Sequence, residues 1–206
     1  MTRATKVVML AALTVVLSIL YPFPVKAEGL SWGGAQIQLV LAAEREVAQK
    51  TGVRTQLAGF FLPSSDVKFA FFYLGPTFTI KRDAYTLWLS PQVGMNWGWY
   101  PEGENGAITS MWAILSFLEN KFSVFAEAET YFGLNGSSAE FYGYFSFDGF
   151  PLEYLNIGVH GEQVNDGVTF GPHVGLAKAP FGCELGYFFD PENGTHAPRF
   201  LLALRF

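Results

Sequence analysis

Residues 85–99 read YTLWLSPQVGMNWGW, and this stretch decides the fold class. Its odd positions are apolar, whereas its even positions are small or polar, with Trp88 as the one bulky exception. A period of two predicts a β-strand. Fifteen residues is long for a strand of a soluble sandwich but fits a tilted transmembrane strand, with one face toward lipid and the other toward a lumen.

The segments 111–118 and 121–132 repeat this pattern on either side of Glu119-Asn120. A two-residue turn there places Phe117 opposite Phe122 on the outward face and Trp112 opposite Glu127 on the inward face. Because apolar residues then meet apolar residues along the whole pair, the register is well specified.

Turn signals divide the rest of the chain into further strands. The pairing of 141–147 with 154–162 is not clean and requires a bulge or a longer turn. The complete set of expected strands is 53–62, 68–81, 85–99, 111–118, 121–132, 141–147, 154–162, 168–177, 181–189 and 199–206. This set predicts an all-β, antiparallel up-and-down transmembrane barrel of ten strands, with eight or twelve as the alternatives, since bacterial single-chain barrels have even numbers. Counting back from Phe206 places the longer connections at the outer end.

The segment 35–50 admits two interpretations. Gln36 to Val47 alternates well enough to be a strand, but an eleventh strand would break the even count. Residues 42–50 are rich in helix formers and are followed by Gly52, a residue typical of helix ends. We therefore expect a periplasmic or plug helix in an N-terminal segment 28–52, ahead of a barrel spanning 53–206.

Residues 1–27 have the pattern of a cleaved signal peptide. Arg3 and Lys6 precede an uncharged apolar run, and Ala27 offers a small-residue cleavage site. A membrane anchor is the alternative, but the run is too short to span a bilayer as a helix. Cleavage leaves 10 basic and 18 acidic residues, a balance that excludes nucleic acid as a partner. The lone Cys183 excludes an internal disulfide.

The last strand carries a recognisable signal. Phe200, Leu202, Leu204 and Phe206 share one face, and Arg199, Leu201, Ala203 and Arg205 share the other. A final alternating strand that ends on Phe resembles the assembly signal of Gram-negative outer-membrane β-barrel proteins. The resemblance implies residence in the outer membrane, contact with its lipids, and insertion by the barrel assembly machinery.

Aromatic residues also gather at the expected outer ends of strands, as in the belts of membrane barrels. These expected interface residues are Trp97, Trp99, Tyr100, Tyr131 and Phe132.

One inward-facing group could carry chemistry. Turn lengths place His160 opposite His173, His173 opposite Glu184, and Glu184 opposite Arg205, with Glu162 two residues along from His160. His160, His173 and Glu184 could bind Zn²⁺ or supply a general base. The favoured interpretation is a polar network that fills a narrow lumen, in which charges must be paired. No His-x-Ser arrangement occurs, unlike in the lipid A deacylase barrels.

We therefore expect a small outer-membrane barrel with a structural or interaction role or a narrow pore, without catalysis or cofactor; the sequence does not specify its ligand. The alternative is an outer-membrane enzyme or metal-binding barrel that uses His160, His173 and Glu184. General diffusion would need about 16 strands or more. A periplasmic carrier of lipocalin type would need an apolar lumen and a polar outer face, the reverse of the pattern here.

Overall fold

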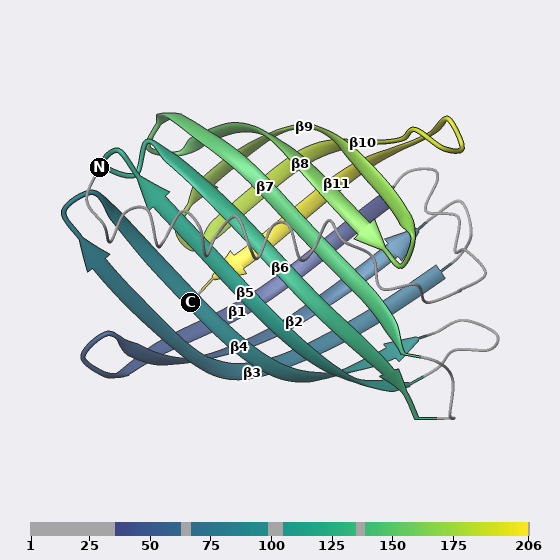
Figure 1. Cartoon of the computed structure of the whole chain (residues 1–206), viewed down its shortest axis with the longest axis horizontal. Coiled ribbons are helices and arrows are strands. Elements are labelled where there is room, and N and C mark those ends of the chain that lie inside the picture. The colour runs from purple at the N-terminus through teal and green to yellow at the C-terminus, as the bar shows by residue number, and fades with distance from the viewer. Residues whose placement is uncertain (1–35, 63–66, 99–104, 135–138, 206) are drawn as a thin grey trace.

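Strands account for most of the residues that the computed structural model describes, namely 36–62, 67–98, 105–134 and 139–205 (Figure 1). Their bounds are β1 (Gln36–Ala48), β2 (Thr51–Leu62), β3 (Val67–Arg82), β4 (Tyr85–Gly98), β5 (Gly106–Phe117), β6 (Phe122–Gly133), β7 (Glu140–Leu152), β8 (Leu155–Val164), β9 (Gly167–Lys178), β10 (Phe181–Asp190) and β11 (Thr195–Arg205). Each strand pairs antiparallel with the next, and together they form a closed barrel.

The closing pair joins β1 to β11 in parallel. An up-and-down barrel with an odd number of strands must have one such pair, because its first and last strands run in the same direction. Leu39 faces Leu202 across this pair, and both side chains point outward and are exposed. Because the sheet closes, every strand has a neighbouring strand on both sides.

The expected helix at 35–50 and the strand count of ten are both wrong. Residues 36–48 form β1, and the described residues contain eleven strands and no helix. The even-number rule led to the error, whereas the alternation in the sequence was the correct signal. Ile37, Leu39 and Leu41 point outward, and β1 hydrogen-bonds to strands on both sides, which a helix cannot do. The barrel thus begins within the segment that we expected to precede it.

The hairpin registers test the alternation directly. Phe117 faces Phe122 and Trp112 faces Glu127, as the sequence predicts. The irregular pairing expected after β7 is present as a register shift between Gly149 and Leu152. The turn itself lies at Glu153-Tyr154, so Asp148 belongs to β7 rather than to a turn.

The two ends of the barrel differ in their connections. At the end where β11 terminates, which we call the turn end, the connections are two to four residues long. The other end, the loop end, holds the longest connections, 99–105 and 134–139.

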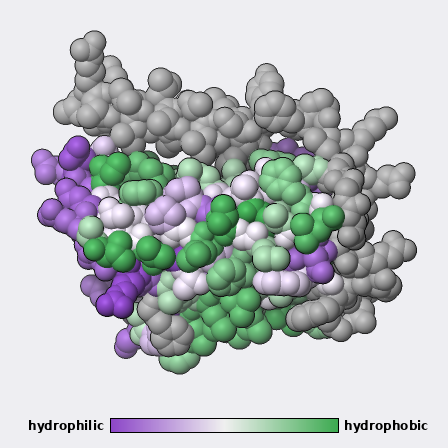
Figure 2. Space-filling model, turned by 90° about the horizontal axis from the view of Figure 1, so that it is seen from below, coloured by the Kyte–Doolittle hydropathy of each residue, from purple (hydrophilic) through white to green (hydrophobic). Residues whose placement is uncertain are grey.

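The polarity of the barrel is inverted relative to a water-soluble protein. Among the described residues, 15 polar or charged side chains are buried against 9 hydrophobic ones. Thirty large hydrophobic residues are exposed instead. Figure 2 shows hydrophobic side chains over much of the barrel wall, with hydrophilic residues gathered at one end.

On the outer face, the charged side chains that the structure describes lie at the turn end. In the described strands, alternation directs most charged side chains inward. The outward ones whose side chains the structure describes are Arg45, Arg82 and Lys178, each within four residues of a strand end. The middle of the wall therefore forms an uncharged band.

Some expectations fall outside the described residues. These are the signal peptide at 1–27, the interface residues Trp99 and Tyr100, and the terminal Phe206. No helix in the described part of the chain is long and apolar enough to cross a membrane.

Candidate functional site

A ring of side chains surrounds the lumen on the inner wall. Consecutive aromatic centroids lie 5.6–6.3 Å apart from Phe71 through Tyr73, Trp112, Phe125 and Tyr144 to His160. His160 then stacks on Phe188 at 3.9 Å, and the Arg199 guanidinium lies 4.2 Å from Phe188 and 5.0 Å from Phe60. Phe60 packs against Phe71, so the ring closes on itself.

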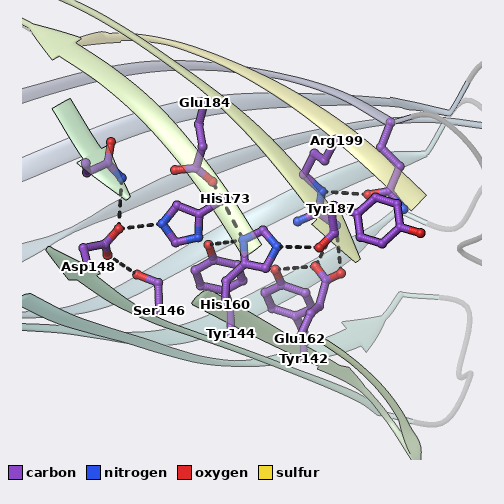
Figure 3. A network of polar contacts seen from close by, with 12 residues as sticks. Tyr142, Tyr144, Ser146, Asp148, His160, Glu162, His173, Glu184, Tyr187 and Arg199 are labelled. Atoms are coloured by element: carbon purple, nitrogen blue, oxygen red, sulfur yellow. Dashed lines mark hydrogen bonds and ion pairs between the residues drawn. The ribbon is translucent and has the colours of Figure 1, made fainter. Parts of the chain in front are cut away.

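Arg199 is also the centre of a buried ion pair (Figure 3). Its Nη2 donates to both carboxylate oxygens of Glu162 at 2.9 and 2.8 Å, and its Nε donates to Gln36 at 2.7 Å. The Tyr142 hydroxyl donates to Glu162 at 2.8 Å. Arg199 and Glu162 are each only 6% exposed, and a buried charge of this kind is tolerated when it is paired and hydrogen-bonded.

Asp148 organises the other half of the network. Its Oδ1 accepts a hydrogen bond from His173 Nε2 at 2.5 Å and another from the Asn156 amide at 2.9 Å. The Ser146 hydroxyl donates to its Oδ2 at 2.7 Å. The Asp148 carboxylate thus accepts hydrogen bonds from side chains on three strands. Those from Ser146 and Asn156 hold it in position to accept the one from His173.

His160 lies between these two halves. Its ring stacks on that of His173 with centroids 4.8 Å apart. Its Nε2 lies 3.2 Å from the Tyr187 carbonyl oxygen, and its Nδ1 lies 3.4 Å from the Tyr144 hydroxyl and 3.9 Å from a Glu184 carboxylate oxygen. One ligand atom from each of His160, His173 and Glu184 falls within a span of 4.8 Å.

Glycines on the neighbouring strands make room for the two imidazoles. A Cβ at Gly186 would lie 2.6 Å from Cε1 of His160, and one at Gly158 would lie 2.9 Å from Cε1 and Nε2 of His173. Any larger residue at these positions would displace the rings. The absence of a side chain at Gly186 and Gly158 therefore provides the space that the two imidazole rings occupy.

A second group of polar side chains lies on the inner wall of β3, β5 and β6. Glu129, which is 2% exposed, accepts hydrogen bonds from Tyr73 at 3.1 Å, Trp112 at 3.5 Å and Tyr131. These three donors satisfy the Glu129 carboxylate, so we interpret the group as packing of the lumen.

The cross-strand row expected from turn lengths is wrong in detail. His160 faces Gly171, His173 faces Gly158 and Gly186, and Glu184 faces Gly175 and Leu201. The predicted pairing assumed a two-residue turn at Asp166-Gly167, whereas the turn lies at Asn165-Asp166. This difference of one residue shifts the register by two. The three residues still meet, because they occupy diagonal positions on adjacent strands.

The arginine of the network was also misassigned. Arg205 does not lie opposite Glu184, which faces Leu201 on β11. It lines a cavity of about 270 Å³ together with Ala42, Glu44, Arg54, Trp88 and Ile114. Arg199, six residues earlier on the same face, pairs with Glu162 instead. The sequence places both arginines on the inward face, and only the three-dimensional register distinguishes them. Asp148 was missed because Asp-Gly-Phe-Pro is a strong turn signal.

The expected interface aromatics divide between the two faces of the wall. Phe132 points outward and is exposed, whereas Tyr131 points into the lumen and donates to Glu129. Trp97 lies near the loop end of β4 and is partly exposed. Phe200 and Leu202 are each 41% exposed on the outer wall, and Leu204 shares their face.

No protein-family model matches the chain, and no curated protein is similar enough to it to count as a relative.

Proposed function

We propose that the chain is an integral β-barrel of the Gram-negative outer membrane, with a structural or interaction role rather than a role in diffusion or catalysis. The inverted polarity of the wall carries the proposal. Exposed leucine, valine, isoleucine and phenylalanine side chains would cost free energy in water, whereas they match a hydrocarbon environment.

Strand length and charge placement support the same location. Every strand has between 10 and 16 residues, and a tilted strand of about 9–11 residues crosses a bilayer. The outward charges Arg45, Arg82 and Lys178 lie at the turn end, where they would meet polar headgroups. In outer-membrane barrels the short turns face the periplasm, so the turn end is the periplasmic end in this proposal.

The contents of the lumen support a role other than diffusion. Eight strands enclose a lumen that side chains fill, and wide aqueous channels need about 16 or more. Here the ring from Phe71 to Phe60 and the pair of Arg199 with Glu162 project into the lumen from around the wall. Hydrogen-bonded side chains from different strands, such as Arg199 and Glu162, also meet across the lumen.

Two matched substitutions on β9 test the location. Val174 lies near the middle of the outward face and Val168 at its loop end, and they are 42% and 36% exposed. In a membrane, we expect Val174→Arg to cost about 2–4 kcal/mol of folding free energy and Val168→Arg about 0–1 kcal/mol. The measurement is reversible unfolding in lipid vesicles, with heat-modifiable gel migration of purified outer membranes as the check on folding.

A water-soluble barrel would respond differently. Both substitutions would then replace an exposed valine by a hydrated side chain, and each would change stability by less than about 0.5 kcal/mol. Equal effects at Val174 and Val168, or recovery of the protein in the soluble periplasmic fraction, would refute the proposed location.

A further inference from the structure

The hydrogen bonds of the two lumen histidines fix the positions of their ring hydrogens. His160 Nε2 approaches the Tyr187 carbonyl oxygen, and His173 Nε2 approaches the Asp148 carboxylate. Both partners can only accept hydrogen bonds. Nε2 therefore carries the hydrogen in each ring, and a neutral imidazole then presents a lone pair at Nδ1.

The lone pair of His173 has no partner among the described residues. Its Nδ1 is buried without a hydrogen bond, and the side chain is only 1% exposed. An unsatisfied buried acceptor of this kind costs about 1–3 kcal/mol. It persists only where something else compensates.

The groups around it are acceptors as well. His160 Nδ1 and a Glu184 carboxylate oxygen lie 3.9 Å apart. When the imidazole is neutral, both atoms are acceptors, so they cannot form a hydrogen bond with each other. The Tyr144 hydroxyl, 3.4 Å from His160 Nδ1, can donate one hydrogen and so can satisfy only one of the three. A single cation would satisfy all three acceptors together.

We propose that His160, His173 and Glu184 bind one divalent transition-metal ion, with Zn²⁺ the ion that two imidazoles and a carboxylate favour. The three ligand atoms lie within 4.8 Å of one another. Tetrahedral zinc would hold them about 3.3 Å apart. Side-chain rotations that bring the atoms closer by roughly 1.5 Å would therefore complete the site. Three protein ligands leave a fourth coordination position for water or a small ligand.

Asp148 is the positioning residue of this site. A metal-bound histidine commonly donates its second N–H to a carboxylate, which fixes the ring and strengthens it as a ligand. Asp148 does this for His173 and is itself held by Ser146 and Asn156. If His173 only filled the lumen, we would expect its Nδ1 to accept a hydrogen bond, but this buried atom has no partner among the described residues.

The inference rests on the lumen geometry and not on where the barrel resides. A water molecule, or a second proton on one imidazole, is the competing explanation for the three acceptors. Either would leave the protein without stoichiometric metal, so metal content separates the explanations.

The experiment measures zinc bound to the untagged, processed protein after removal of metal with a chelator and equilibrium dialysis against Zn²⁺. We expect one Zn²⁺ per chain, lost in His173→Gln and in His160→Gln. Asp148→Asn should keep the three ligands but bind Zn²⁺ about 10–100-fold more weakly. Bound Co²⁺ should give visible absorption bands that disappear in the same variants.

The third histidine provides the matched control. His196 is exposed, and its Nδ1 contacts the Tyr187 hydroxyl at 2.5 Å, away from the lumen cluster. His196→Gln should retain one Zn²⁺ per chain. If His173→Gln does not fold, as judged by gel migration, Glu184→Gln replaces it, since the Glu184 side chain is 26% exposed and keeps its shape. The proposal is overturned if the wild type binds no stoichiometric Zn²⁺, or if His196→Gln lowers zinc binding as much as the folded ligand variants.

Discussion

The pair formed by Arg199 and Glu162 offers the sharpest test of how the lumen is held together. The perturbation is Arg199→Met, which keeps an unbranched apolar side chain but removes the charge. It deletes two hydrogen bonds to Glu162, one to Gln36, and the contacts of the guanidinium with Phe188 and Phe60.

The expected magnitude follows from burial. Glu162 is 6% exposed and would keep only the hydrogen bond from Tyr142. Breaking a buried ion pair by removing one partner costs about 3–5 kcal/mol, mostly because the other charge is left without compensation. The double variant Arg199→Met with Glu162→Gln removes both charges, and we expect it to recover more than half of that loss.

The assay is equilibrium unfolding by denaturant in vesicles or micelles, followed by tryptophan fluorescence and gel migration. Arg205→Met is the control, since Arg205 lies on the same strand and face but is exposed, and its loss should cost less than about 1 kcal/mol. The reasoning fails if Arg199→Met is as stable as Arg205→Met, or if the double variant is no more stable than Arg199→Met alone.

Two further predictions concern the packing of the lumen. Gly186→Ala places a Cβ 2.6 Å from the His160 ring and should cost about 1–3 kcal/mol, whereas Gly182→Ala on the same face of β10 meets nothing closer than 3.8 Å and should be nearly neutral. Equal unfolding midpoints for the two variants would contradict the close packing around His160. The wild-type barrel, reconstituted in planar bilayers, should show no steady ionic conductance, and a reproducible open channel would show that the side chains do not occlude the lumen.

Much of the fold could be predicted from the sequence because strand alternation is local. The outward and inward sets of 85–98 and the facing of Phe117 and Phe122 follow from the period of two and from one short turn. The same alternation is present in 36–48, but local helix propensity and the even-strand rule favour a helix there. Alternation was the better guide, since a barrel can close with one parallel pair.

The candidate site was predicted only in part. The inward facing of His160, His173 and Glu184 follows from alternation alone. Their contacts do not, because a shift of one residue at Asn165-Asp166 moves the register by two.

The amino-acid sequence is enough to predict a barrel with an apolar outer wall and a polar lumen, because alternation along each strand assigns every residue to one of two faces. It is not enough to predict which of the inward residues are in contact. Asp148, next to the register shift in a segment whose sequence predicts a turn, is the partner of His173. Arg199 is the partner of Glu162, and Leu201 rather than the expected Arg205 lies opposite Glu184. The physical reason is that the tilt and closure of the sheet set the diagonal neighbours across the lumen, and no single strand contains that information.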